Sequence, residues 1–310
     1  MTIERYNEIL NSSEFQKELR PKLDHLRDLL RSGRASVMVG AGFSKNAQME
    51  EGVDIKDWNG LAQIFYKIAY GHEPSDKDLK LRAPIELASR VTSLHGHDFM
   101  DSLLEKILPD DKISPGKLHK ELVKLPWADI YTTNYDSLLE RADSSKAYYY
   151  IRGEKDIIQK SGARIIKLHG SFPDVKPYVI DQNDYRDYSV THPLLTAVIH
   201  NTLITNRLYL IGFSGDDPNF LNWISWLRNN SNGVDVPPVY LFDALGEQIT
   251  EADLQYKKSY GIEIIQRPAG FCGISEYFEF IFRYLKDEQI DRNDEWDISV
   301  SYEQLRKVRN

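Results

Sequence analysis

Short apolar runs without polar interruptions are the feature that most constrains how this 310-residue chain can fold. A run that is apolar at nearly every position is typical of a strand buried on both faces, and glycine or polar residues follow most of these runs. Helix-length segments separate most of them. The pattern predicts a doubly wound α/β fold with a mostly parallel sheet. The predicted strands are residues 35–39, 129–133, 164–168, 207–211, 238–242 and 262–265.

Segments outside the strands define the expected domain organisation. Residues 1–34 form an N-terminal helical segment with apolar positions on one face, and Pro21 is a candidate break. Residues 35–285 form the main domain, in which a helical insertion at about 45–125 contains no clear strand and is expected to cover the site. Residues 286–310 are a charged C-terminal segment, interpreted either as a linker to further sequence or as a terminal surface helix.

Composition excludes several classes of function. A formal net charge of −8 disfavours nucleic-acid binding, and the longest apolar runs are far shorter than the roughly 20 residues that cross a bilayer. The N-terminus has no apolar signal-peptide core, so a cytoplasmic location is expected. Cys272 is the single cysteine, which excludes an intrachain disulfide and a four-cysteine zinc site. No metal is expected.

The first polar cluster follows the strand at residues 35–39. In doubly wound sheets, ligands bind beyond the carboxyl ends of the strands. Gly40-Ala41-Gly42-Phe43-Ser44 places two glycines there, at the start of an expected helix whose amide groups can bind a diphosphate. Glycine is also needed in tight left-handed turns for steric reasons alone, and the sequence leaves both explanations open.

The second and third clusters follow the strands that end at residues 133 and 168. Asn134 either caps the next helix or uses its carboxamide to hold sugar hydroxyls or a water molecule. His169 precedes a glycine at a strand end, where it is either a structural histidine or a general base that titrates near neutral pH.

The fourth cluster, residues 212–217, combines two glycines, a serine and two carboxylates. Asp216 and Asp217 either contact a ligand or start a helix with Pro218, since aspartate is a good cap and proline suits the first turn. A fifth and weaker signal is Asp243, a carboxylate at a strand end of the kind that binds a ribose.

Taken together and in this order, the clusters resemble the sirtuin superfamily over residues of about 35–245, and most closely its bacterial branch used in antiphage defence. The resemblance implies a Rossmann-like fold, NAD⁺ as substrate and no metal. It also implies that Asn134 and His169 are the catalytic pair. The implied NAD⁺ contacts are Gly40, Ala41, Gly42, Phe43, Ser44, Asp57, Thr133, Asp136, Gly212, Phe213, Ser214, Asp216 and Asp243.

Two departures distinguish this chain from protein-deacylating sirtuins. It lacks the four cysteines of their zinc ribbon, and residues 45–49 differ from their cofactor loop; Asp57-Trp58 is a candidate replacement. We therefore expect an NAD⁺ hydrolase that depletes NAD⁺, giving nicotinamide and ADP-ribose. The alternatives are an NAD⁺ or ADP-ribose sensor, a protein deacylase and a degenerate interaction protein.

The expected partners rest on analogy with the same branch. They are a second copy of the chain in a homo-oligomer, and either a phage-derived activator or a partner defence protein such as a ring ATPase. No motif in the sequence chooses among them.

Overall fold

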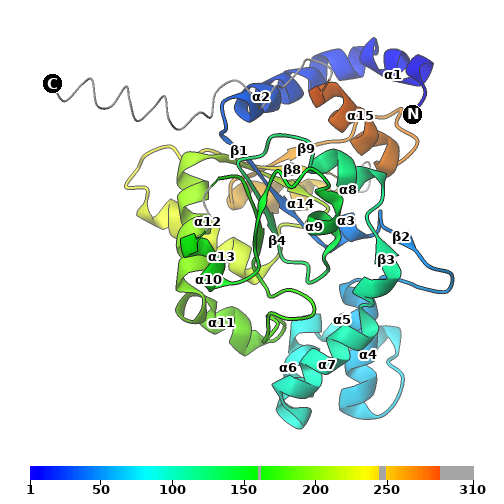
Figure 1. The fold of residues 1–310 in the computed structure, drawn as a ribbon, viewed down its shortest axis with the longest axis vertical. Helices are drawn as coiled ribbons and strands as arrows, with labels where there is room; N and C mark the ends of the chain where they lie inside the picture. The colour runs from blue at the N-terminus through cyan, green and yellow to red at the C-terminus, as the bar shows by residue number, and fades with distance from the viewer. Residues whose placement is uncertain (160–161, 244–248, 287–310) are drawn as a thin grey trace.

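The computed structural model describes residues 1–159, 162–243 and 249–286. Its centre is a seven-stranded sheet in the order β5-β6-β4-β1-β7-β8-β9, in which every described strand pair is parallel (Figure 1). This confirms the predicted doubly wound α/β fold. The strands are β1 (Ala35–Val39), β4 (Asp129–Thr132), β5 (Tyr149–Ile151), β6 (Arg164–Lys167), β7 (Arg207–Ile211), β8 (Val239–Phe242) and β9 (Ile262–Ile265).

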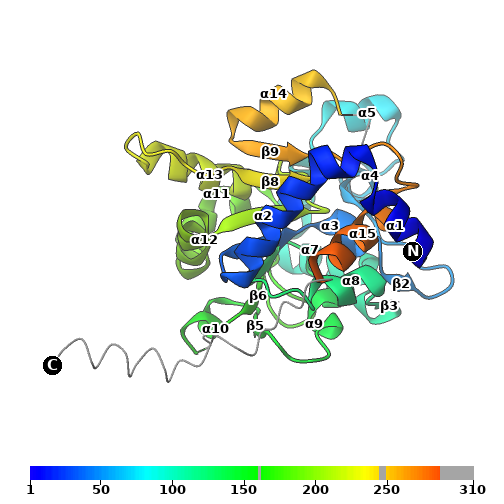
Figure 2. The same ribbon diagram turned by 90° about the horizontal axis from the view of Figure 1, so that it is seen from above.

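Helices cover both faces of the sheet, which is why its strands are apolar at nearly every position. In β1, Val37 and Val39 enter one hydrophobic core and Met38 enters the other. Figure 2 shows the sheet between its two helical layers. The first layer contains α1 (Ile3–Leu10), α2 (Arg20–Arg31), α3 (Ala41–Ser44), α8 (Lys117–Leu122), α9 (Leu138–Ala142) and α15 (Ile274–Lys286). The second contains α10 (Glu154–Gln159), α11 (Gln182–Thr191), α12 (Pro193–Thr205) and α13 (Pro218–Asn230), and α14 (Glu251–Ser259) packs beside β9.

The N-terminal segment is helical, as predicted, but its boundary differs from the candidate break at Pro21. The first helix, α1, ends before Asn11, and a π-helical turn, η1 (Phe15–Leu19), leads directly into α2. Pro21 lies in the first turn of α2. Because the Arg20 N–H donates to the Phe15 carbonyl of η1, the helix continues through this turn, and the N–H that Pro21 lacks falls where the π-helical hydrogen-bond pattern gives way to the α-helical one.

A helical cap, defined here as residues 58–107, lies beyond one end of the sheet (Figure 1). Its apolar side chains, among them Phe65 and Met100, form a third core with Tyr135, Phe172 and Tyr178. Because these three aromatic residues follow β4 and β6, the cap packs against the loops at the carboxyl ends of those strands. The cap helices are α4 (Trp58–Tyr70), α5 (Asp76–Leu81), α6 (Pro84–His95) and α7 (His97–Ile107).

A small antiparallel ribbon joins the cap to the sheet, although no strand was predicted within residues 45–125. Its two strands, β2 (Gln48–Met49) and β3 (Ile113–Ser114), are each two residues long, and a 3₁₀ turn, η2 (Asp110–Lys112), precedes β3. Strands this short leave no periodic pattern in a sequence.

Two further expectations concern the ends and the surroundings of the chain. Most of the predicted charged C-terminal segment, residues 287–310, lies outside the described residues. Among the helices of the described ranges, none combines the length and the apolar character needed to cross a bilayer.

Candidate active site at the carboxyl edge of the sheet

The strand register places the predicted clusters side by side. Val39 of β1 pairs with Thr132 of β4 on one side and with Ile211 of β7 on the other, and Thr132 also pairs with Lys167 of β6. The residues that follow these strand ends therefore emerge at one edge of the sheet, called here the carboxyl edge. It is the edge at which doubly wound folds bind their ligands.

The glycines of the first and fourth clusters touch each other through their backbones. Gly42 N–H donates to the Gly212 carbonyl at 3.0 Å, and a Cβ on Gly40 would lie 2.6 Å from the same oxygen. Gly212 has a φ of +60°, and a Cβ there would lie 2.4 Å from the Phe43 nitrogen. Glycine is thus required because two loops meet. A left-handed turn adds to this requirement at Gly212 but not at Gly40, whose backbone is extended, and Gly215 also has a positive φ, of +73°.

This loop contact limits the amide groups that were expected to bind a diphosphate. The N–H groups of Gly40, Gly42 and Phe43 already donate to protein carbonyls, and α3 is only four residues long. Ala41, the first residue of α3, is exposed. Diphosphate binding at this turn stays a prediction. Fewer backbone N–H groups are left to bind the diphosphate than the sequence indicated.

A hydrogen-bonded chain joins three of the predicted residues. The buried Ser44 hydroxyl donates to Asp136 Oδ2 at 2.8 Å, and Asn134 Nδ2 donates to Ser44 Oγ at 2.9 Å. Because a carboxylate can only accept, the Ser44 proton is committed to Asp136, and Ser44 can only accept from Asn134. The carboxamide orientation of Asn134 is thereby assigned from its network. Its Oδ1 has no hydrogen-bond partner within the described part of the chain.

Buried ionisable residues that the sequence did not single out surround Asp136. Lys167 donates to the Asp136 carbonyl and lies 3.8 Å from Glu140. His119 is 1% exposed, and neither ring nitrogen has a hydrogen-bond partner among the described residues. Burial lowers the pKa of His119 to about 4, although the negative charge of Asp136 opposes this shift. His119 is therefore neutral at pH 7.

His169 lies in a closed, largely aromatic environment. Its side chain is buried, with the Tyr185 ring edge-on at 5.3 Å and Asn219 Nδ2 at 3.5 Å from its Nε2. Burial lowers the pKa of His169, and Asp217 opposes the shift. The imidazole is thus neutral, which is the form that can accept a proton. Asn219 was not predicted, and its position in the first turn after Asp217-Pro218 is the signal that was available.

Tyr135 connects the loop that bears Asn134 to the loop that bears His169. Its hydroxyl donates to the Val179 carbonyl at 2.7 Å, and Val179 N–H donates to the His169 carbonyl at 3.0 Å. The loops after β4 and β6 are therefore held together, with Thr133 half-buried at the end of β4.

The β7 loop uses its carboxylates for structure. Asp217 caps α13 and accepts from Phe220 N–H at 3.1 Å, which confirms the helix-start interpretation of Asp217-Pro218. Asp216 is half exposed and forms an ion pair with Lys257 at 2.5 Å, while Lys257 also donates to the Ser214 carbonyl. Phe213 is buried and Ser214 is exposed.

Asp57 and Asp243 lie at the margins of the site. Asp57 caps α4 and pairs with Lys45 at 2.9 Å, and this cation holds the pKa of Asp57 below its usual value. Asp57 and Lys45 line an open depression of about 440 Å³. Asp243 is buried, and its N–H donates to the Ile265 carbonyl at the end of β9.

Several known proteins are similar in sequence or fold to parts of this chain. A SIR2-like domain model matches residues 128–265, which include Asn134 and His169 but not Gly40–Ser44. Defense-associated sirtuin 2 of Bacillus subtilis is 24% identical over 82% of this chain and 25% of its own length. NAD(+) hydrolase ThsA of Enterococcus faecium is 31% identical over 41% of this chain and 30% of its own length. A crystal structure of a SIR2 homologue in complex with NAD covers 84% of this chain and 93% of its own, at 13% identity and a TM-score of 0.47.

The chain thus spans 25% of the first of these relatives and 30% of the second. Within it, the family match begins just before β4 and ends with β9, so it contains six of the seven strands of the sheet, all but β1. Residues 128–265 thus match a SIR2-like domain, which confirms the resemblance to the sirtuin superfamily that the strand-end motifs predicted.

Proposed function

We propose that the carboxyl edge of this sheet binds NAD⁺ and hydrolyses the bond between nicotinamide and ribose, giving nicotinamide and ADP-ribose. The observation that carries the proposal is the orientation of Asn134, whose Nδ2 is held by Ser44 so that Oδ1 is left for a ligand. A fixed carbonyl oxygen can accept a hydrogen bond from a ribose hydroxyl or from an attacking water molecule.

The reaction needs no general acid to protonate the leaving group. Nicotinamide is attached to ribose as a cationic pyridinium, so it leaves as a neutral molecule without being protonated. The transition state resembles an oxocarbenium ion, as in glycoside hydrolysis, and water adds to the anomeric carbon. Neutral His169 would take the proton from the water or from a ribose hydroxyl.

Electrostatic support for the developing positive charge is assigned to Asp136 and Asn134. Asp136 lies one hydroxyl away from the carboxamide, through Ser44. The carboxylates of Asp57 and Asp216, which the sequence placed among the NAD⁺ contacts, are each paired with a lysine. A carboxylate that is already neutralised in this way stabilises a nearby cation less.

The names of two relatives agree with this proposal and extend it. One is named a defense-associated sirtuin and the other an NAD(+) hydrolase, and we infer that this chain likewise depletes NAD⁺, in the cytoplasm, as part of antiphage defence. A homo-oligomer and an activating partner belong to the same proposal.

The test is to incubate the purified chain with NAD⁺ and to follow nicotinamide and ADP-ribose by chromatography. Nicotinamide release by wild type, lost in Asn134→Ala and His169→Ala and kept in His95→Ala on the surface of the cap, supports the hydrolase. Release that depends on an added acylated peptide identifies a deacylase instead. Calorimetric binding of NAD⁺ without any product identifies a sensor.

A further inference from the structure

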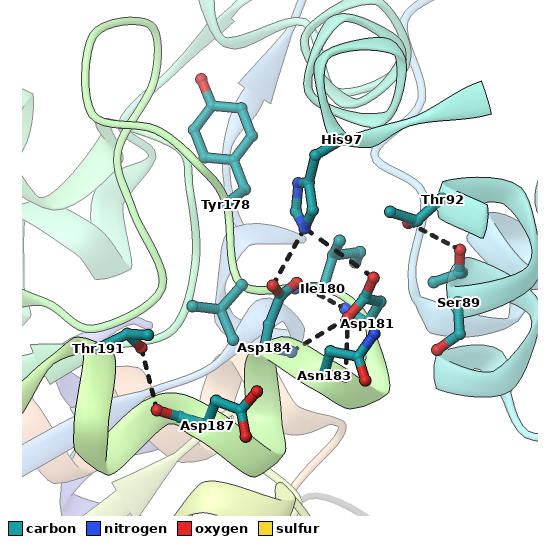
Figure 3. Close-up of polar contacts among 12 residues, drawn as sticks. Ser89, Thr92, His97, Tyr178, Ile180, Asp181, Asn183, Asp184, Asp187 and Thr191 are labelled. Atoms are coloured by element: carbon teal, nitrogen blue, oxygen red, sulfur yellow. Dashed lines mark hydrogen bonds and ion pairs between the residues drawn. The ribbon is translucent and has the colours of Figure 1, made fainter.

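A cluster of potential metal ligands lies outside the candidate active site, where the cap meets α11. His97 is the first residue of α7, Asp181 is the N-cap of α11, and Asp184 lies in the first turn of that helix. Figure 3 shows the His97 ring pointing from the cap toward both carboxylates. The cluster therefore joins two segments that are far apart in the sequence.

In each of the two carboxylates, one oxygen accepts the hydrogen bonds of the helix cap, and the other oxygen takes no part in the cap. Asp181 Oδ1 accepts from the N–H groups of Asn183 and Asp184, at 2.8 and 3.1 Å. Asp184 Oδ2 accepts from the N–H groups of Ile180 and Asp181, at 2.9 and 3.0 Å. These bonds fix both side chains. The two remaining oxygens are presented to His97.

The three remaining atoms have nearly the spacing of a coordination sphere. His97 Nε2 lies 3.0 Å from Asp184 Oδ1 and 3.9 Å from Asp181 Oδ2, and one ligand atom from each residue lies within 4.8 Å of the other two. Ligands at 2.0–2.2 Å from a tetrahedral metal ion are roughly 3.3–3.6 Å apart. Shifts of these ligand atoms by about 1 Å would bring them to that spacing.

The other nitrogen of His97 supplies an independent indication. Nδ1 is buried, has no hydrogen-bond partner among the described residues, and lies 3.8 Å from Asp101 Oδ1. Asp101 is itself 5% exposed and is held by the Tyr178 N–H at 3.2 Å. Metal-binding histidines characteristically direct their second N–H at a carboxylate, and Asp101 lies beside Nδ1, although at more than hydrogen-bond distance.

We propose that His97, Asp181 and Asp184 bind one divalent transition-metal ion, with Asp101 beside the second nitrogen of His97. One imidazole and two carboxylates suit Zn²⁺ or Mn²⁺, whereas Ca²⁺ and Mg²⁺ prefer oxygen ligands alone. The ion offsets the negative charge of carboxylates gathered around one histidine. It also fastens the cap to α11, a helix whose Tyr185 packs against His169. The site departs from the sequence expectation of no metal.

The experiment is a calorimetric titration of the metal-free full chain with Zn²⁺, and separately with Mn²⁺, after dialysis against a chelator. Wild type is expected to bind one ion, and His97→Gln and Asp184→Asn to bind it at least about tenfold more weakly. His95→Gln is the matched control, because His95 is an exposed histidine two residues away and outside the cluster. Binding by the control should equal that of wild type.

Two results would overturn the proposal: wild type that binds neither ion, or His97→Gln that binds as tightly as wild type. Asp184→Asn alters a helix cap and can weaken folding, but His97 lies outside that cap, so the His97 variant alone decides the question. Circular dichroism verifies that each variant is folded. The titration uses no NAD⁺, so its outcome is independent of the proposed hydrolase.

Discussion

Replacing buried His119 by leucine should remove a large part of the acid sensitivity of this fold. His119 packs edge-on against Phe43 at 4.9 Å, and both of its ring nitrogens are buried without a hydrogen-bond partner among the described residues. Leucine has a similar volume and no polar atom to leave unsatisfied. At pH 7.5 the variant should therefore be at least as stable as wild type.

The direction of the pH effect follows from the lowered pKa. The folded value is about 4 and the ordinary value is 6.5. Above pH 6.5 the imidazole is neutral in both states and its contribution to stability is complete. As the pH falls from 6.5 toward 4, the unfolded chain binds a proton that the folded chain cannot, so stability is lost. At 1.36 kcal/mol per pKa unit the total loss is about 3 kcal/mol, and about 2 kcal/mol of it occurs by pH 5.

Urea unfolding followed by circular dichroism at pH 7.5 and pH 5.0 measures this effect. His169, His192 and His200 also have pKa values lowered by burial, so wild type and variant should both lose stability in acid. The difference between the two proteins isolates His119. Between pH 7.5 and pH 5.0, the free energy of unfolding of wild type should fall by about 2 kcal/mol more than that of the variant. An equal loss of unfolding free energy in wild type and variant between the two pH values would refute the inference that His119 is buried in its neutral form.

Two further substitutions test the geometry of the carboxyl edge. Gly212→Ala should lower the free energy of unfolding by about 2 to 5 kcal/mol, because it adds a Cβ 2.4 Å from the Phe43 nitrogen at a φ of +60°. Gly52→Ala, at a φ of +78° in open space, should cost only about 1 to 2 kcal/mol, and equal urea midpoints would contradict the loop contact. Ser44→Ala removes hydrogen bonds of 2.8 and 2.9 Å and should cost about 2 to 4 kcal/mol. It should also slow nicotinamide release by freeing Asn134, and unchanged stability and turnover would argue against the network.

The sheet was largely predictable because strands buried on both faces leave continuous apolar runs. β1, β7 and β9 have the predicted bounds, and β4, β6 and β8 differ from them by one residue at one end. β5 was missed because it is a three-residue edge strand in which Tyr149 is exposed. Its short length and exposure give neither a continuous nor an alternating pattern.

The candidate site was predictable only as a set of strand ends. Parallel pairing brings those ends together whatever the intervening sequence, so Asn134 and Ser44 could be placed at one edge before their distance was known. Their hydrogen bond could not be foreseen, because 90 residues separate them. His119 is one of eight histidines, and only the three-dimensional packing against Phe43 distinguishes it.

The kinetics of nicotinamide release by Asn134→Ala test the central claim most directly. Initial rates are measured over a range of NAD⁺ concentrations for wild type, Asn134→Ala and Asn201→Ala, an exposed asparagine of α12 that serves as control. If Asn134 positions the reacting groups, kcat should fall by about 100-fold or more while KM changes little and the control matches wild type. A kcat for Asn134→Ala equal to that of wild type would contradict the account.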